Sequence, residues 1–388
     1  MLSCKNKHKE GQYFTTNKQL QDNVVKLILN NPALILEPSV GRGHLVAAVK
    51  NTRPSVEFDM YEIDDTLSLV QGVSNNVRYC DFMKEDIVKT YKTIIGNPPY
   101  VKTSNKNLYV QFIEKCYELL EPNGELIFIV PSDFFKLTSS MYLLRNMMIY
   151  GSFTHIYHPH KENLFKNATI DIIVFRYCKN PSIDKTVLYN GVLRNIINTG
   201  GLLTFPSSLD SDHFVVKDYF NAYVGLVSAK ESVYKHETLG NIMLINGKNK
   251  LDKYIYIGSY PSIDISINNY LCSHKEALIS RKIRKFSEKN WFEWGAPRNI
   301  KTMQKYKGQK CIYIHTLTRK HEVAFVGTMG YFGGGLIALM PRESNHCNLE
   351  TIVEYMNRPE FKDDFMYSGR FKIGHRLLCN SRIPLSCL

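Results

Sequence analysis

A short apolar stretch that runs directly into a glycine-rich turn constrains the fold of this chain more than any other feature. The segment Ala33 to Leu36 has the length and composition of a buried strand, and the turn Glu37 to Gly43 follows it without a break. A strand that feeds a glycine turn and then a helix is the nucleotide-site geometry of a doubly wound α/β sheet. Gly41 and Gly43 let the backbone approach a ligand closely, and the helix start beyond them offers free N–H groups.

Two further predicted strands lead to acidic residues. Val56 to Tyr61 leads to Glu62, at about the distance downstream where such folds place a ribose-binding acid. Val77 to Cys80 leads to Asp81-Phe82. Because parallel strands end at the same edge of a sheet, we expect these side chains to line one crevice.

A fourth apolar segment, Thr93 to Gly96, ends in Asn97-Pro98-Pro99-Tyr100, which suits methylation of an exocyclic amine. The lone pair of such an amine is delocalised into the base ring and must leave conjugation before the nitrogen can attack a methyl donor. The Asn97 side-chain oxygen and the Pro98 carbonyl can each accept one N–H of the amine, while the two prolines stiffen the loop. Tyr100 can stack on the base.

These motifs resemble those of the S-adenosylmethionine-dependent amino-methyltransferases of DNA, in the class whose cofactor motifs precede a C-terminal target-recognition domain (gamma class order). Near the N-terminus, Gly11 to Thr16 is similar to the family's opening cofactor loop, with Thr16 standing where proline is usual. The resemblance covers nearly the whole chain. It implies an α/β fold with a Rossmann-like seven-stranded methyltransferase sheet, followed by an α+β target-recognition domain. Turn formers near Cys178 to Ser182 place the boundary, so we expect a catalytic domain at 1–180 and a recognition domain at 181–388.

The same resemblance assigns roles to individual residues. It implies that S-adenosyl-L-methionine is the cofactor, with Glu62 on its ribose and Asp81 and Phe82 on its adenine. Catalysis is assigned to the Asn97 loop and to an aromatic ring in the loop before the strand expected at 169–177. The cofactor-binding residues are Thr15, Glu37, Gly41, Gly43, Glu62, Asp81, Phe82 and Asn97, and the catalytic residues are Asn97, Pro98, Tyr100 and Phe165.

A base inside a duplex cannot reach a buried cofactor, so the resemblance also implies that the target nucleotide is flipped out of its stack. Stacking of roughly 1 to 3 kcal/mol per base would offset much of the cost, and we expect Tyr100 and Phe165 to hold the base between them. Transfer would then be a direct in-line displacement, which requires neither a metal nor a covalent intermediate.

Adenine N6 is the expected target. Methylation of cytosine carbon 5 requires a thiolate nucleophile, normally in a Pro-Cys dipeptide, and no proline of this chain precedes a cysteine. Cytosine amino-methyltransferases resemble the chain but usually carry Ser in place of the first Asn of the loop, so Asn97 favours adenine while N4-cytosine remains the alternative. The same loop occurs in enzymes that methylate RNA bases or a protein glutamine. These usually carry their recognition parts before the catalytic domain.

The charge distribution supports a nucleic-acid substrate. The chain of 388 residues has a formal charge of +13, with 21 Lys and Arg against 18 Asp and Glu in residues 1–180 and 28 against 18 in residues 181–388. Residues 281–320 hold only Glu288 and Glu293 as acids. Their basic residues, expected to bind phosphates in a salt-dependent way, are Arg281, Lys282, Arg284, Lys285, Lys289, Arg298, Lys301, Lys305, Lys307, Lys310, Arg319 and Lys320.

Aromatic residues are interleaved with these charges, and two segments resemble parts of adenine methyltransferases of the restriction-modification kind. The first is Asn290 to Asn299, which contains Trp291 and Trp294. The second is Tyr367 to Arg376, which resembles the closing part of the recognition domain.

The expected partners are double-stranded DNA and a cognate restriction endonuclease that acts on the same site without forming a stable complex. We expect a monomer. We also expect no metal site, since Pro159 interrupts the histidines at 155, 158 and 160. Nine scattered cysteines and the lack of a secretory or membrane-spanning segment favour a cytoplasmic location, in a prokaryote or in the host of a virus. The alternative from another class is a catalytically silent DNA-binding subunit, which the intact loop and Glu62 disfavour.

Overall fold

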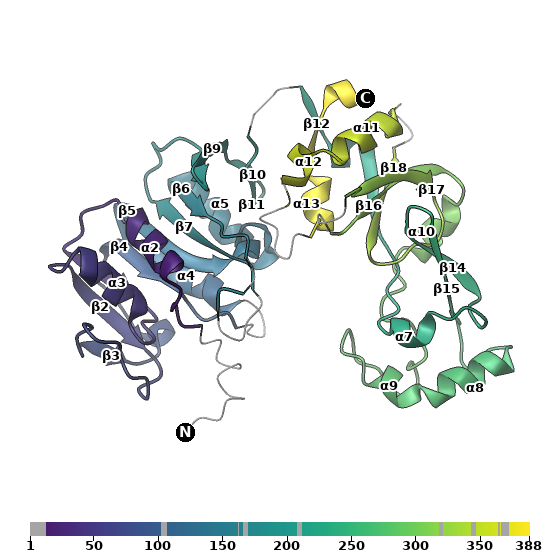
Figure 1. Cartoon of the computed structure of the whole chain (residues 1–388), viewed down its shortest axis with the longest axis horizontal. Helices are drawn as coiled ribbons and strands as arrows, with labels where there is room; N and C mark the ends of the chain where they lie inside the picture. Colours follow the sequence, from purple (N-terminus) through teal and green to yellow (C-terminus); the bar gives the residue numbers. More distant parts are fainter. Residues whose placement is uncertain are drawn as a thin grey trace. The chain divides into compact units, whose positions relative to one another are not determined.

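The computed structural model describes residues 13–101, 107–161, 163–165, 170–207, 212–317, 321–342, 347–363, 365 and 372–388. These residues gather into two compact units, unit 1 up to residue 207 and unit 2 from residue 212 (Figure 1). The boundary lies later than the expected position near residue 180. The reason is that strands β8 (Thr186–Tyr189) and β9 (Val192–Asn195) extend the sheet of unit 1.

Unit 1 is built on a mixed sheet with nine strands among the described residues, in the order β3-β2-β1-β4-β5-β7-β6-β8-β9. Strands β3, β2, β1, β4 and β5 are parallel, whereas β7 runs antiparallel to both β5 and β6. The seven expected strands are therefore joined by two more at the β6 edge. The other strands are β1 (Leu34–Glu37), β2 (Glu57–Glu62), β3 (Val77–Tyr79), β4 (Tyr91–Gly96), β5 (Leu120–Pro131), β6 (Ser152–Tyr157) and β7 (Ile172–Cys178).

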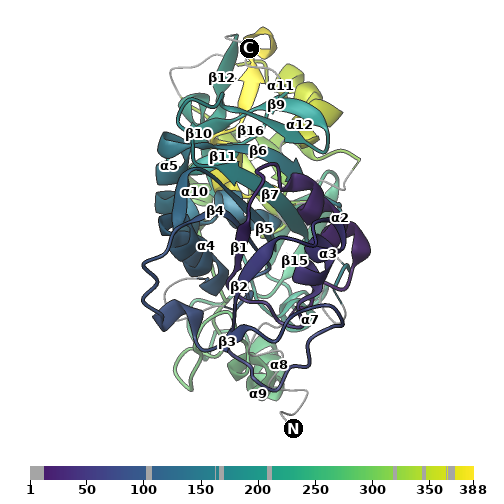
Figure 2. The same cartoon turned by 90° about the vertical axis from the view of Figure 1, so that its left-hand side faces the viewer.

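Helices cover both faces of this sheet (Figure 2). Apolar residues of α2 and α3 pack on one face, where Ile127 of β5 points, and residues of α4 and α5 pack on the other, where Phe128 points. Successive strand residues alternate between faces, so a strand buried on both sides must be apolar throughout, as β5 is from Leu126 to Val130. The helices are α2 (Lys18–Leu27), α3 (His44–Thr52), α4 (Leu108–Glu118) and α5 (Met141–Tyr150).

Helix α2 starts six residues before the helix expected at 24–29. Its buried residues Leu20, Val24 and Leu27 have helical spacing, and the Asn17 side chain accepts the N–H of Leu20 at 3.1 Å. Such an N-cap satisfies a backbone donor that the helix itself leaves unpaired. The cap therefore fixes where the helix begins, directly after the segment that carries Thr15.

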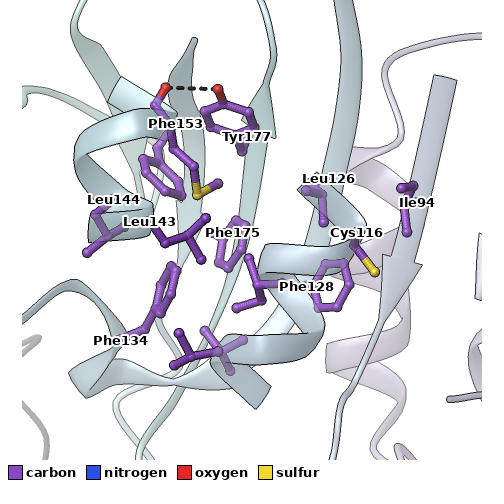
Figure 3. Packing of buried hydrophobic residues seen from close by; sticks show 14 of the residues in the cluster. Ile94, Cys116, Leu126, Phe128, Phe134, Leu143, Leu144, Phe153, Phe175 and Tyr177 are labelled. Carbon is purple, nitrogen blue, oxygen red and sulfur yellow. Dashed lines mark hydrogen bonds between the residues drawn. The ribbon is translucent and has the colours of Figure 1, made fainter. Parts of the chain in front are cut away.

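Aromatic rings fill the layer between the sheet and α5 (Figure 3). Phe134 and Phe175 stack with ring centroids 5.5 Å apart, and Phe153 meets Phe175 edge to face at 5.3 Å. The buried Tyr177 hydroxyl donates to the carbonyl of Met147 at 2.8 Å, so its polar atom is satisfied. Phe134 belongs to η2 (Ser132–Lys136), which follows β5, and this packing holds the carboxyl end of β5 in place.

A hairpin of β10 (Ile197–Thr199) and β11 (Leu202–Thr204) completes the strands of unit 1. Beside η2, the short helices of this unit are η1 (Phe82–Lys84), which follows β3, and η3 (Thr138–Ser140), which precedes α5.

Unit 2 combines an antiparallel sheet, in the order β13-β18-β16-β17, with the hairpin β14-β15, the pair β12-β19 and short helices. Within the described ranges, no helix is long and apolar enough to cross a membrane. The elements of unit 2 are β12 (His213–Val215), α6 (Val216–Tyr219), β13 (Phe220–Val224), α7 (Glu231–Tyr234), β14 (Ile242–Gly247), β15 (Lys250–Tyr254), α8 (Ile265–Ser273), α9 (Lys275–Ile279), α10 (Ile300–Lys305), β16 (Lys310–His315), β17 (Ala324–Thr328), β18 (Leu336–Pro341), α11 (Leu349–Met356), α12 (Pro359–Asp363), α13 (His375–Cys379), β19 (Arg382–Pro384) and η4 (Leu385–Cys387).

Candidate active site

The carboxyl ends of β1, β2 and β4 border a cavity of about 340 Å³ in unit 1. Five of the predicted site residues line it: Gly41, Glu62, Asp81, Phe82 and Asn97. A smaller cavity of about 30 Å³ adjoins it, and its lining adds Thr15 and Glu37. The predicted residues that line neither cavity are Gly43, Pro98, Tyr100 and Phe165.

Glu62, at the end of β2, holds the glycine turn. Its Oε2 accepts the N–H of Gly41 at 2.7 Å, and its Oε1 accepts the N–H groups of Ile63 and Asp64 at 2.9 and 3.0 Å. Gly41 and Gly43 have φ angles of +56° and +80°, which glycine adopts readily and other residues rarely do. The carboxylate therefore has a fixed orientation at the cavity wall and retains the capacity to accept a further donor.

Glu37, the last residue of β1, is a buried acid with a weak partner. Its side chain is 1% exposed, and its Oε1 accepts the N–H of Ser39 at 3.3 Å. Burial disfavours the charged form and raises the pKa of Glu37 from 4.5 to about 8, and the nearby Glu62 adds to this shift. A cationic ligand group in the small cavity would favour the ionised carboxylate.

Asp81 and Phe82 place a polar edge beside an apolar wall. Asp81 Oδ1 accepts the N–H of Met83 at 3.1 Å, which caps η1, and Oδ2 lies 3.3 Å from Lys84 Nζ. The buried Phe82 ring packs edge-on against Tyr61 at a centroid distance of 5.3 Å. The pair can therefore offer an acceptor and a flat surface to one planar ligand.

Asn97 is held by the N-terminal segment. Its Nδ2 donates to the carbonyl oxygen of Tyr13 at 2.7 Å and to Thr15 Oγ1 at 3.0 Å. Both amide hydrogens thus have partners, so the Oδ1 atom, an acceptor, must face the opposite direction. There it accepts the Tyr100 hydroxyl at 2.5 Å.

The Tyr100 hydroxyl has a second acceptor, the carbonyl oxygen of Ile129 in β5, at 3.1 Å. A hydroxyl carries one proton, so Asn97 and Ile129 compete for it. Burial raises the pKa of Tyr100 well above its ordinary value, with Tyr13 nearby adding to the effect, so this proton stays on the oxygen. The hydroxyl can therefore turn to Ile129 and leave Asn97 Oδ1 to another donor.

The rings of Tyr100 and Phe165 are not two parallel faces between which a base could stack. Their ring centroids are 6.2 Å apart with an interplanar angle of 66°, which is an edge contact. The Tyr13 ring stacks on Tyr100 at 5.3 Å and 29° and contacts Phe165 at 5.6 Å. A base stacked on that face of Tyr100 would take the place of the Tyr13 ring, so capture of a base there requires the Tyr13 side chain to move, whereas its backbone carbonyl can still hold Asn97.

Tyr13 is the site residue that sequence reasoning missed. It lies within the predicted cofactor loop, between residue 12 and Phe14, and its aromatic character was the available signal. Phe14 lines both cavities and packs beside the glycine turn, 3.3 Å from where a Cβ on Gly41 would lie. The first residues of that loop, Gly11 and Gln12, lie outside the described residues, as do Lys166 to Thr169 after Phe165.

In unit 2, the aromatic and the basic side chains of the segment 281–320 lie in different places, the first mostly in the core and the second mostly at the surface. The large aromatic side chains of this segment are mostly buried in the unit's core, among them Phe286, Trp291, Trp294 and Tyr313. The cations left at the surface, where they could contact phosphates, are Lys282, Arg284, Lys285, Lys289, Arg298, Lys301, Lys305, Lys307 and Lys310.

Arg281 is an exception among these cations, because it is buried. It donates to the backbone carbonyls of Leu278, Ser228 and Trp291 and lies 3.8 Å from the centre of the Phe286 ring. Its contacts stabilise the unit and leave it inaccessible to DNA. Arg319, Lys320 and the segment 367–371 lie outside the described residues.

Comparison with known proteins finds that this chain is similar to DNA methyltransferases. Residues 69–165 match the model of a family described as Eco57I restriction-modification methylase. The type II methyltransferase M.HincII of Haemophilus influenzae is 28% identical over 202 residues, covering 46% of this chain and 39% of M.HincII. The modification methylase CviBIII of Paramecium bursaria Chlorella virus NC1A is 27% identical and covers 59% of this chain and 60% of that relative. This chain thus spans less than two thirds of either relative's length.

Among solved structures, the type IIL restriction-modification enzyme MmeI, in complex with DNA, matches 96% of this chain and 63% of its own. The TM-score is 0.57 and the sequence identity is 10%. A match at this identity shows a shared fold.

Proposed function

We propose that this chain, which is homologous to the type II restriction-modification DNA methyltransferases, transfers a methyl group from S-adenosyl-L-methionine to N6 of an adenine flipped out of duplex DNA. The observation that carries the proposal is the fixed amide of Asn97, whose Nδ2 is held by Tyr13 and Thr15 at the wall of a cavity of about 340 Å³. Methylation would protect the DNA site from a cognate endonuclease.

The residues around the two cavities suit this cofactor. Glu62 would accept from the ribose, Asp81 from the adenine amino group, and Phe82 would pack on the adenine ring. Thr15 and Glu37 would face the methionine end in the small cavity, where a cationic group of the cofactor would favour the ionised form of Glu37, which burial alone disfavours. The bound sulfonium supplies an electrophilic methyl group.

The chain's own contribution to transfer is positioning. The Asn97 Oδ1 and the Pro98 carbonyl would each accept one N–H of the target amine and turn its lone pair toward the methyl donor. For this the Tyr100 hydroxyl would direct its proton to Ile129, which already lies within hydrogen-bond distance. The flipped adenine would replace the Tyr13 ring against Tyr100 and meet Phe165 as well.

Unit 2 would recognise the DNA. Its exposed cations along residues 282–310 would neutralise phosphates, and polar side chains among them would read base edges. This assigns methyl transfer to unit 1 and target recognition to unit 2. The protein would act as a monomer and would form no stable complex with an endonuclease.

The test is incorporation of tritiated methyl groups from the labelled cofactor into duplex DNA by the purified chain, followed by mapping of modified bases in a methylated plasmid. The proposal expects label on adenine N6. Label on cytosine N4 would correct the target base, and label only in RNA or protein would overturn the substrate. A cofactor titration without any binding signal would indicate a silent DNA-binding subunit.

A further inference from the structure

A buried network of hydrogen-bonded polar side chains lies at the carboxyl edge of the sheet of unit 1, outside the two cavities. The Asp171 carboxylate receives the Ser132 hydroxyl at 2.5 Å on one oxygen and lies 2.8 Å from His158 Nε2 on the other. His158 Nδ1 lies 2.5 Å from the Tyr189 hydroxyl. All four side chains are nearly or fully buried, between 1% and 8% exposed.

One tautomer of the His158 ring satisfies all of these contacts. With the proton of a neutral imidazole on Nε2, His158 donates to Asp171, and Nδ1 accepts from the Tyr189 hydroxyl. The neighbouring His160 ring lies beside the His158 ring, with centroids 3.9 Å apart and an interplanar angle of 34°, and burial lowers the pKa of His160 to about 4. A buried network whose members are paired in this way has one preferred geometry.

This hydrogen-bond network joins the ends of four strands. Ser132 follows β5, His158 follows β6, Asp171 precedes β7, and Tyr189 ends β8. A backbone hydrogen bond from the Ser132 N–H to the Asp171 carbonyl at 3.0 Å reinforces the β5 connection. His158 and Asp171 also mark the two ends of the connection that carries Phe165 near its middle.

The same contacts connect the two rings that the proposed mechanism uses. Tyr100 is attached to β5 through its hydroxyl and the Ile129 carbonyl, three residues before Ser132. Phe165 packs in the same apolar cluster as Ile172, the residue after Asp171. Any shift of Asp171 against β5 would therefore move the support of one ring relative to the other.

We propose that Asp171 and His158 are positioning residues, which hold the ends of the Phe165 segment against β5 so that Phe165 and Tyr100 keep the spacing needed to capture the target base. This inference rests on the proposed function. It adds a role in base capture to a cluster that touches neither of the two cavities.

The chain contains a matched control in the same sheet. Glu125 and Arg176 form another buried pair, 2.7 Å apart, near the opposite end of β7 from Asp171. Glu125→Gln and Asp171→Asn each remove one buried carboxylate charge at nearly constant volume. Both should lower stability, but only Asp171→Asn should change base capture.

Base capture is followed by fluorescence with a duplex that carries 2-aminopurine in place of the target adenine, at the position found by mapping a methylated plasmid. The KM for DNA is measured with the same duplex carrying adenine, because 2-aminopurine has no 6-amino group to methylate. For Asp171→Asn we expect the fluorescence gain on binding to fall and the KM for DNA to rise about two- to thirtyfold, with cofactor Kd unchanged. Glu125→Gln should keep both values near those of the unaltered chain. If Asp171→Asn does not fold, Ser132→Ala is the second variant, which removes the side-chain hydrogen bond to Asp171 and keeps the backbone one. It should give a smaller loss of base capture, again with cofactor Kd unchanged.

Two results would overturn the inference. One is base capture by the folded variant, Asp171→Asn or Ser132→Ala, that equals that of the unaltered chain. The other is an equal loss of capture in Glu125→Gln, which would reduce the effect to general stability. An unaltered chain that methylates no DNA would instead overturn the proposed function, and this inference with it.

Discussion

Two buried carboxylates in one sheet have opposite surroundings. Glu125, in β5 and fully buried, accepts the N–H groups of Leu29 and Asn30, the Thr93 hydroxyl and the Arg176 Nε–H, at 2.7 to 3.1 Å. Glu37, at the end of β1 and equally buried, accepts the Ser39 N–H at 3.3 Å.

The difference separates a structural acid from one available to a ligand. A carboxylate with four donors, one of them a guanidinium, is compensated inside the protein and stabilises the fold only while all its partners remain. A buried carboxylate with one long hydrogen bond is poorly compensated, so its charge is favoured only when something else arrives. Glu125 thus belongs to the part of the sheet that stabilises the fold, and Glu37 belongs to the part that borders the candidate site.

Glu125→Ala is expected to have the largest effect on stability. Removing the acid leaves the Arg176 charge buried without its partner, which costs about 3–5 kcal/mol of unfolding free energy. Urea unfolding should show this loss while the folded fraction still binds cofactor normally. A loss below about 1 kcal/mol would remove the contrast between the two acids.

Glu37 is expected to make stability depend on pH in the ligand-free protein. Its folded pKa of about 8 exceeds its ordinary 4.5, so the protonated acid favours folding fully below 4.5, and this contribution is lost as the pH rises toward 8. The difference between these two pKa values limits the resulting change in unfolding free energy to about 5 kcal/mol, and we expect a change of about 2–4 kcal/mol.

The matching variant is Glu37→Gln, which imitates the protonated acid and should flatten this dependence. Unfolding of both proteins at pH 5 and pH 8.5 measures the difference. Parallel profiles for the two proteins would show that Glu37 is not a poorly compensated acid.

Glu62→Ala sharpens the contrast within the site. Its carboxylate holds the glycine turn and would accept from the ribose, so its loss should weaken cofactor binding by about 1.5–3 kcal/mol, or roughly ten- to hundredfold. Calorimetric titration with the cofactor gives this value directly. Glu125→Gln serves as the control, and equal losses in both variants would refute a local role for Glu62.

Lys301→Ala and Lys305→Ala in unit 2 should have the smallest effects. Each exposed cation that contacts a phosphate should reduce the slope of log affinity against log salt by about 1. Buried Arg281 should act differently, because it supports the backbone carbonyls of Ser228 and Trp291. Its replacement is expected to lower stability, and an altered salt slope at full stability would contradict that assignment.

The sequence predicted which residues meet at one cavity best where those residues stand at a strand end. Glu62, Asp81 and Asn97 each follow or end a strand, and parallel order brings such ends to one edge. Gly41 and Gly43 adopt positive φ in the turn, and Gly41 lines the cavity whereas Gly43 does not.

Features set by distant contacts could not be predicted in the same way. The stacking of Tyr13 on Tyr100 joins residues 87 positions apart, and no periodic pattern encodes it. Likewise, β8 follows turn residues that suggested a domain end, yet it pairs in parallel with β6. The burial of Arg281 depends on carbonyls that two other segments supply.

The central claim is that Asn97, held by Tyr13 and Thr15, prepares an adenine amine for methyl transfer. Single-turnover methylation of mapped duplex DNA by Asn97→Ala tests it most directly, with DNA and cofactor affinities measured on the same protein. The account predicts a rate loss of at least about a hundredfold, or 2.7 kcal/mol, with DNA affinity unchanged. A rate within about tenfold of the unaltered chain would contradict it.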